Sequence, residues 1–188
     1  MKPEKCQIKH FEVDDLLLKK AGKYAKVIEL AADSLFTRHT VAKYTGVDLE
    51  RDILKAVAVE AVRATGAIGI GFVKGFGLNR GAIASSFTQN GECIVAVGKS
   101  DEDIASAIRR VAALGRGAVL VTGGMLMAEL TAADQTQAFF KAAQQLGSGL
   151  ADPLATLCLL TNTALPELRL TSAGLFDLAK GATVPLFE

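Results

Sequence analysis

The stretch from 91 to 130 alternates short apolar runs with one amphipathic helix, and this pattern restricts the fold most. Residues 93–97 (CIVAV) lie between glycines and predict a buried strand. Ser100 can cap the helix that follows, since its hydroxyl can accept a bond from a free N–H of the first turn. Apolar residues then recur at helical spacing until Gly115, which ends the helix. Residues 118–130 (AVLVTGGMLMAEL) predict two strands joined at a Gly-Gly turn.

The rest of the chain adds further short elements. The run 52–62 (DILKAVAVEAV) could form a strand or a helix, and its β-branched side chains favour a strand. The apolar residues 153–165 leave both structures open. The other expected strands are 7–13, 25–30, 34–44 and two pieces of the tail around a turn at 172–174, and a second helix is expected over 132–146. The prediction is an α/β fold: a single domain over 1–188, with a mixed β-sheet and at least two covering helices.

Composition argues against several partners and locations. Lys and Arg number 21 against 20 for Asp and Glu, so no basic excess points to nucleic acid. No run approaches the ~18 apolar residues of a membrane helix, and the first residues lack the apolar core of a signal peptide. The three cysteines are far apart in sequence, which fits reduced thiols better than a disulfide framework. We therefore expect a cytoplasmic protein with no nucleic acid and no membrane as partner.

The sequence predicts no catalytic or metal site of its own. The chain has 2 histidines, His10 and His39, and they are far apart in sequence. No H-x-H or H-E-x-x-H spacing is present, so a histidine-rich metal centre is not predicted. No G-x-S-x-G is present either, and the serines have no evident histidine partner.

Two features could still bind a ligand or move a proton. Lys74 and Arg80 lie in a glycine-rich stretch whose backbone N–H groups could hold an anion beside them. The alternative is that the glycines let two backbones pack closely. Glu60 lies in the apolar run 52–62, and burial would raise its pKa and suit it to a proton shuttle. The alternative is an ordinary strand residue that faces solvent.

Three stretches together resemble the C-terminal domain of bacterial and archaeal adenine deaminases. They are DILKAVAVEAVRATGAIGIGFVKGFGLNRGAIASS (52–86), IVAVGKSDEDIASAI (94–108) and LPELRLTSAGLFD (165–177). They occur in the family's order, and the similarity runs from about Phe11 to the end. Motifs as long as GFVKGFGL and PELRLTSAGLFD are specific to this family.

The resemblance implies a reaction that this chain does not carry out alone. Enzymes of the family deaminate adenine to hypoxanthine with a water activated by a divalent metal. The metal ligands belong to an amidohydrolase (β/α)8 barrel, which takes roughly 250 residues and precedes this domain. The expectation is therefore a stand-alone C-terminal-like domain with no cofactor of its own.

Where the family typically carries H-D-S-H-N, this sequence has Gln89, Asn90, Gly91, Glu92 and Cys93. Of the family's E-R-H before the glycine-rich stretch, only the glutamate, Glu60, is kept. The histidines able to exchange a proton near neutral pH are replaced. This difference predicts a domain without deaminase activity by itself.

Three functions remain open from the sequence. The leading hypothesis is binding of a partner or a purine-like small molecule, with a homo-oligomer expected. The second is a non-catalytic subunit of a split adenine deaminase, whose partner is a separate amidohydrolase-barrel protein. The third is an anion- or nucleotide-binding module at the glycine-rich loop. The candidate ligand-binding residues are Glu60, Lys74, Arg80, Gln89, Asn90 and Glu92.

Overall fold

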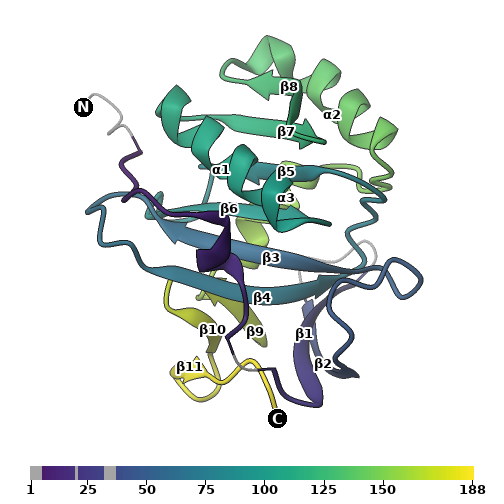
Figure 1. The fold of residues 1–188 in the computed structure, drawn as a ribbon, viewed down its shortest axis with the longest axis vertical. Helices are drawn as coiled ribbons and strands as arrows, with labels where there is room; N and C mark the ends of the chain where they lie inside the picture. The colour runs from purple at the N-terminus through teal and green to yellow at the C-terminus, as the bar shows by residue number, and fades with distance from the viewer. Residues whose placement is uncertain (1–5, 20, 32–36) are drawn as a thin grey trace.

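A mixed sheet of eight strands forms the centre of the protein (Figure 1). The computed structural model describes residues 6–19, 21–31 and 37–188. The strand order is β2-β1-β4-β3-β6-β5-β7-β8; β1 and β4 pair in parallel, and the other neighbours are antiparallel. The strands are β1 (Tyr24–Leu30), β2 (Thr37–Lys43), β3 (Ile53–Glu60), β4 (Ile68–Lys74), β5 (Ala82–Ser85), β6 (Cys93–Gly98), β7 (Ala118–Thr122) and β8 (Met125–Leu130). The predicted mixed sheet is confirmed.

One face of the sheet is covered by helix α1 (Asp101–Leu114). As predicted, Ser100 caps it: the Ser100 hydroxyl oxygen accepts a hydrogen bond from the backbone N–H of Asp103 at 3.3 Å. Gly115 ends the helix with φ 79°. The buried stripe of α1 packs on β3, β5, β6 and β7; its members are Ile104, Ala105, Ala107, Ile108 and Val111.

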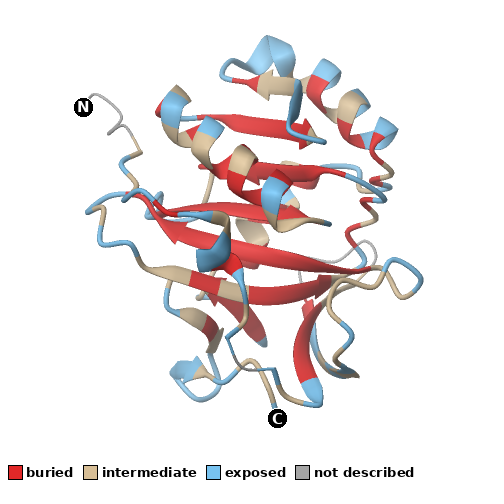
Figure 2. Ribbon diagram, viewed as in Figure 1, coloured by how far each residue is buried: buried red, intermediate tan, exposed pale blue. Residues whose placement is uncertain are grey.

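The opposite face is covered by two helices and a second sheet. The helices are α2 (Thr136–Gln145) and α3 (Pro153–Leu160). The second sheet has the order β11-β10-β9, with β9 (Leu168–Thr171), β10 (Gly174–Asp177) and β11 (Ala182–Val184). These elements share one apolar cluster with the large sheet. The α1, α2 and α3 helices confirm the expected α/β domain with at least two covering helices, and Figure 2 shows that the central strands are buried along their length.

One local prediction was wrong, and one run that the sequence left open is assigned by the structure. Residues 7–13 form no strand. Besides the short 3-10 helix η2 (Ala133–Gln135), which lies between β8 and α2, the described chain has the 3-10 helix η1 (Val13–Leu16), which begins at the last residue of this segment. Its turn forms because the Asp15 carboxylate accepts a hydrogen bond from the N–H of Glu12 at 2.9 Å. The ambiguous run 153–165 begins as a helix, because Asp152 accepts bonds from the N–H groups of Leu154 and Ala155. The expected strand 34–44 is seen as β2, and its first residues lie outside the described part of the chain.

The glycine-rich stretch begins within β4, and its residues 75–81 form a loop that leads to β5. The alternative explanation for its glycines, close packing of two backbones, is confirmed at Gly69. A Cβ atom there would collide with the carbonyl oxygen of Thr171 and lie 2.7 Å from the backbone nitrogen of Gly174. Gly69 therefore lets the second sheet rest directly on β4.

No helix that the structure describes within 6–19, 21–31 and 37–188 combines the length and the apolar character needed to cross a membrane.

The close approach at Gly69 gives a test of this packing. Gly69→Ala should lower the free energy of unfolding by about 2 kcal/mol, because the added methyl group forces the two sheets apart. Gly149→Ala is the matched control, since its Cβ would meet nothing within 4 Å. Urea unfolding of both variants measures the difference, and equal stabilities would contradict this account of the packing.

Candidate functional site

The six predicted site residues lie at two opposite ends of the large sheet. In the antiparallel register of β3 and β4, Lys74 pairs with Ile53, at the end of β3 farthest from Glu60. Glu60 instead pairs with Cys93 on β6, beside the candidates 89–92. Arg80 precedes β5 at the same end as Lys74, because Ala82 pairs with Gly98. The structure therefore separates the two cations from the other four residues.

Both cations contact partners within the protein. The Lys74 Nζ lies 2.9 Å from the Glu29 Oε1, and this ion pair joins β4 to β1. Arg80 donates from its Nη2 to the carbonyl oxygen of Gln145 at 3.4 Å. Each cation is held by a different element, so this end of the sheet does not assemble the converging pair that an anion site at the glycine-rich loop would use.

Glu60 is buried, but it does not have the raised pKa that the sequence suggested. Its carboxylate accepts hydrogen bonds from the backbone N–H groups of Val62 (2.8 Å), Arg63 (2.6 Å) and Thr65 (2.8 Å), and from the Thr65 hydroxyl (3.0 Å). Burial raises the pKa of Glu60, and the four hydrogen bonds outweigh burial and lower this pKa to about 2. Glu60 is 5% exposed, so the alternative of a solvent-facing residue is also wrong. The geometry makes it an anchor for the turn that follows β3.

Residues 88–92 form a polar turn between β5 and β6. The N–H of Gly91 donates to the carbonyl of Thr88 at 3.2 Å, and Gly91 has φ 64°, a conformation that favours glycine. The Thr88 hydroxyl donates to the carbonyl of Cys93 at 3.3 Å and ties the turn to β6. Thr88 and Asn90 each line two cavities, so the polar turn is a wall shared by both.

The first of these cavities, here the threonine pocket, measures about 270 Å³. It lies between the polar turn, the segment after α3 and the second sheet. Its lining residues are Thr88, Asn90, Glu92, Cys93, Thr161, Thr163, Leu170, Thr171, Ser172 and Phe176.

Several hydroxyl groups of the threonine pocket are already engaged. Thr161 donates to the carbonyl of Cys158 at 2.9 Å, and Thr171 donates to the carbonyl of Gly174 at 3.0 Å. Within the described residues, the lining groups without a side-chain hydrogen bond are the amide of Asn90, the carboxylate of Glu92 and the hydroxyls of Thr163 and Ser172. The ring of Phe176 adds an apolar surface to these polar groups.

Sequence reasoning missed the residues that close this pocket on the far side. Thr163 and Phe176 come from the last quarter of the chain, and no motif there indicated a ligand. The only local signal was the hydroxyl pair in T-N-T (161–163) after an apolar run.

The second cavity, here the cysteine pocket, measures about 560 Å³ and lies on the other side of the polar turn. Its lining includes Gln89, Asn90, Arg116 and Asp152, together with Cys6 and Cys158. The three cysteines are free thiols, as their spacing predicted.

Burial decides the protonation of these thiols. It raises the pKa of Cys6 against the opposing effects of the Ser86 hydroxyl and Arg116, and it raises the pKa of Cys158. Burial raises the pKa of Cys93 to about 11. All three thiols are therefore neutral near pH 7 and weak nucleophiles. Within residues 6–19, 21–31 and 37–188, no three His, Cys, Asp or Glu side chains are placed to hold a metal ion together.

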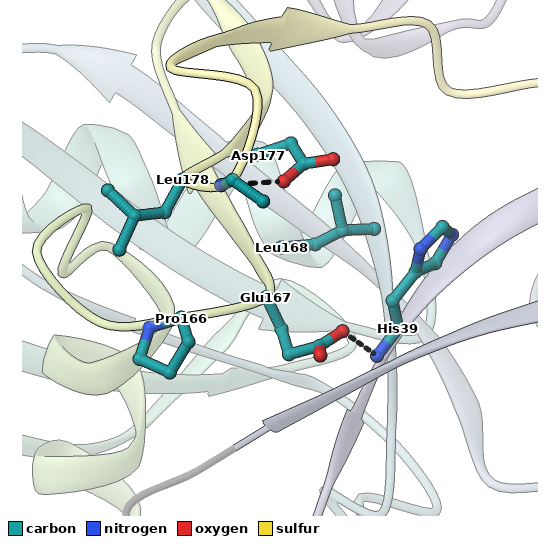
Figure 3. A pocket seen from close by; sticks show the side chains of 7 residues that line it. His39, Pro166, Glu167, Leu168, Asp177 and Leu178 are labelled. Carbon is teal, nitrogen blue, oxygen red and sulfur yellow. Dashed lines mark hydrogen bonds between the residues drawn. The ribbon is translucent and has the colours of Figure 1, made fainter.

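A third cavity of about 340 Å³ lies between β2 and the second sheet (Figure 3). The Glu167 carboxylate there accepts a hydrogen bond from the backbone N–H of His39 at 3.1 Å. The Asp177 carboxylate accepts one from the N–H of Ala179 at 3.0 Å. The side chain of Arg169 is fully buried, and its Nη2 donates a hydrogen bond to the carbonyl of Pro166 at 2.9 Å. These bonds shape the 166–179 region, and no sequence pattern connected this region with His39.

Comparisons with known proteins agree on one family. The model of the adenine deaminase C-terminal domain matches residues 33–133 and 130–182. An adenine deaminase of Dehalococcoides mccartyi is 34% identical over 198 residues, which cover 95% of this chain and 35% of that protein. One of Methanoculleus marisnigri is 39% identical over 180 residues, covering 87% and 34%. One of Desulfatibacillum aliphaticivorans is 33% identical over 214 residues, covering 99% and 37%. The chain thus spans about one third of the length of these relatives.

The bonds to Glu60 predict a pH-dependent contribution to stability. Glu60→Gln should lower the free energy of unfolding at pH 7 by about 2 kcal/mol, because the amide replaces a charged acceptor of several hydrogen bonds. The pKa of Glu60 is lowered in the fold, so its contribution is complete above the ordinary glutamate pKa and disappears as the pH falls toward about 2. Urea unfolding of both proteins at several pH values measures this. A stability difference that stays constant from neutral to acidic pH would contradict the assignment.

Proposed function

The chain belongs to the adenine deaminase C-terminal domain family, and we propose that it is a non-catalytic domain that binds a purine-like small molecule in the threonine pocket. The relatives are adenine deaminases by name, and the chain covers about one third of each. Because the names of these relatives contain a purine, adenine, we propose a purine-like ligand for this chain. One observation carries the proposal: a single cavity is lined by the polar side chains of Asn90, Glu92 and Thr163 together with the aromatic ring of Phe176.

The chemistry of the pocket supports a nucleobase. A carboxamide can donate and accept at once, which matches the adjacent donor and acceptor on the edge of adenine. An aromatic ring can stack on the face of any base. Asn90 would form hydrogen bonds with the edge of the ligand, and the ring of Phe176 would stack on its face. Glu92 would accept from a ring N–H or an exocyclic amino group.

The size of the pocket supports a free base over a nucleotide. Pockets for drug-sized ligands usually measure about 300–1,000 Å³, and the threonine pocket lies just below that range at about 270 Å³. Lys74 and Arg80, which could hold a phosphate, lie at the opposite end of the sheet. A phosphorylated ligand would therefore find no cation from this pair beside the pocket.

The titration of the nearby groups supports a role in binding rather than catalysis. Glu60 has a pKa of about 2, and that of Cys93 is about 11, so neither exchanges a proton near neutral pH. Gln89 and Glu92 stand where the resemblance places the family's histidines, and Asn90 stands where it places the aspartate, so no imidazole able to titrate near neutral pH is present at these positions.

A second candidate function is a non-catalytic subunit of a split adenine deaminase. Kinship with the C-terminal domain of adenine deaminases favours it, since this domain makes up about one third of those relatives. Co-expression with a separately encoded amidohydrolase barrel tests it, and a complex that survives purification would be expected. Failure of the two chains to co-purify would count against this function, and it would leave the proposal of purine binding unaffected.

Binding can be tested by thermal shift with free bases. At about 100 times its Kd, adenine or hypoxanthine should stabilise the protein by ~2.7 kcal/mol. Asn90→Ala and Phe176→Leu should abolish this shift, because they remove the edge contact and the stacking surface. Gln89→Ala is the control, since Gln89 lines only the cysteine pocket, and it should keep the shift. No shift with any base, or an undiminished shift in Asn90→Ala, would refute the proposal.

The non-catalytic role has its own test. Purified protein with added Mn²⁺, Fe²⁺ or Zn²⁺ should produce no hypoxanthine from adenine above the rate of a protein-free blank, because the groups named above do not exchange protons near neutral pH. A chromatographic assay follows both bases. Hypoxanthine formation that rises with protein concentration would overturn the non-catalytic role.

A further inference from the structure

A cation lines the cysteine pocket without an acidic partner among the residues that the structure describes. Arg116 is exposed, and in the described part of the chain no carboxylate forms an ion pair with it and its side chain donates no hydrogen bond. Its guanidinium contacts the ring of Phe87, with 5.5 Å between the Arg116 Cζ and the ring centroid. A guanidinium over an aromatic face keeps the N–H groups at its edge free for an anion.

The backbone on both sides of Arg116 is held by hydrogen bonds. The carbonyl of Gly115 accepts a hydrogen bond from the N–H of Cys6 at 2.8 Å. The N–H of Gly117 donates to the Ser86 hydroxyl oxygen at 2.9 Å, and the carbonyl of Gly117 accepts from the N–H of Ser86 at 2.9 Å. Two parts of the chain that are distant in sequence thus fix this segment, so the base of the Arg116 side chain is preorganised for binding.

The pocket is large enough for an organic molecule, and it offers further donors. Its volume of about 560 Å³ lies within the range of about 300–1,000 Å³ that is usual for small-molecule sites. Gln89 lines this pocket but not the threonine pocket, and Asn90 lines both. Each carboxamide can donate two hydrogen bonds. A guanidinium and a carboxamide that belongs to this pocket alone therefore line the same cavity.

The acidic residue of this pocket is engaged by helix α3. The Asp152 Oδ1 accepts hydrogen bonds from the N–H groups of Leu154 at 3.0 Å and Ala155 at 2.8 Å. This carboxylate lies at the positive end of the helix dipole, which offsets part of its charge. Because Asp152 caps the helix and forms no ion pair with Arg116 in the described part of the chain, the guanidinium is left to an anion from solvent.

We propose that the cysteine pocket binds a phosphate ester of a small molecule, with Arg116 and Gln89 as the residues that hold the phosphate. The guanidinium fork can bind two phosphate oxygens at once, as it would bind a carboxylate. A phosphate has a third terminal oxygen that points in another direction, and the Gln89 amide can donate to it. The second donor therefore favours phosphate over carboxylate. This site is separate from the threonine pocket, so the proposal does not rest on purine binding.

The rest of the pocket fits the organic part of such an ester. Leu154, Ala155 and the thiols of Cys6 and Cys158 line it beside the polar groups. Aliphatic side chains and neutral thiols form an apolar wall. A phosphate ion alone would leave this wall exposed to water, whereas the organic part of an ester would cover it.

The thiols of the pocket can report on its occupancy. Ribose 5-phosphate at about ten times its Kd should slow the alkylation of Cys6 and Cys158 by N-ethylmaleimide about tenfold, because the unoccupied fraction falls to about one tenth. Cys93 lines the threonine pocket instead, and its labelling rate in the same sample, followed by mass spectrometry, corrects for any general change in stability. Inorganic phosphate should need a higher concentration for the same protection, and ribose should give none.

Substitutions of the two phosphate-binding residues locate the site. Arg116→Gln should raise the concentration for half protection at least about tenfold, because hydrogen bonds from a charged donor are lost. Gln89→Ala should raise it by a smaller factor, and it replaces Arg116→Gln if that variant does not fold. Arg63→Gln is the matched control, since it removes the same charge from an exposed residue that lines none of the four cavities described above. Each variant is compared with its own labelling rate without ligand, and circular dichroism establishes that it folds.

Four outcomes would overturn the proposal. They are unchanged labelling with both phosphate compounds, equal protection by ribose, undiminished protection in the folded phosphate-site variant, and an equal loss of protection in Arg63→Gln. Equal half-protection concentrations of inorganic phosphate and ribose 5-phosphate would overturn the organic part of the ligand and assign the site to free phosphate. The base-binding test reads the threonine pocket, where Gln89→Ala keeps the thermal shift, so either result can fail without the other.

Discussion

Strand β3 is buried at every one of its positions, and the rest of the fold follows from this constraint. A strand buried on both faces needs a layer on each side, because neither face can be left to solvent. Helix α1 supplies one layer, and α2, α3 and the second sheet supply the other. The adjacent residues Val57 and Ala58 belong to the two different clusters, Val57 on the side of α1 and Ala58 on the opposite side. Successive side chains of a strand point to opposite faces, so this alternation is expected for a strand between two layers.

The two charged residues of β3 show what such burial requires. The Lys55 Nζ lies 2.6 Å from the Asp101 Oδ1 and donates to the carbonyl of Leu16 at 2.9 Å, so it joins β3 to α1 and η1. Glu60, at the other end of the strand, is satisfied by the turn that follows it. A buried charge without partners would cost several kcal/mol, and each of these charges has at least two. The ends of the central strand are therefore fixed by polar contacts, while its middle is apolar.

The sequence was sufficient where the deciding contacts are local. The strands at 25–30 and 93–97 and the helix after Ser100 follow from short patterns and a cap, and they form as predicted. It was insufficient where the deciding contact is distant. The need for glycine at position 69 comes from Thr171, and the separation of Lys74 from Glu60 depends on strand register. For Glu60 the sequence left burial and solvent exposure open, and the direction of its pKa is set by backbone N–H groups of a turn that no sequence pattern revealed.

The polar turn adjoins two cavities at once, and this has a thermodynamic consequence. Asn90 has a single carboxamide, which can turn toward the threonine pocket or toward the cysteine pocket. A ligand of the threonine pocket that held this amide would withdraw it from the cysteine pocket, so a second ligand that needed the same amide would bind there less tightly. By linkage, the factor by which the first occupant weakens the second equals the factor by which the second weakens the first. One asparagine in a shared wall would therefore couple ligand binding in the two cavities, wherever both ligands use its carboxamide.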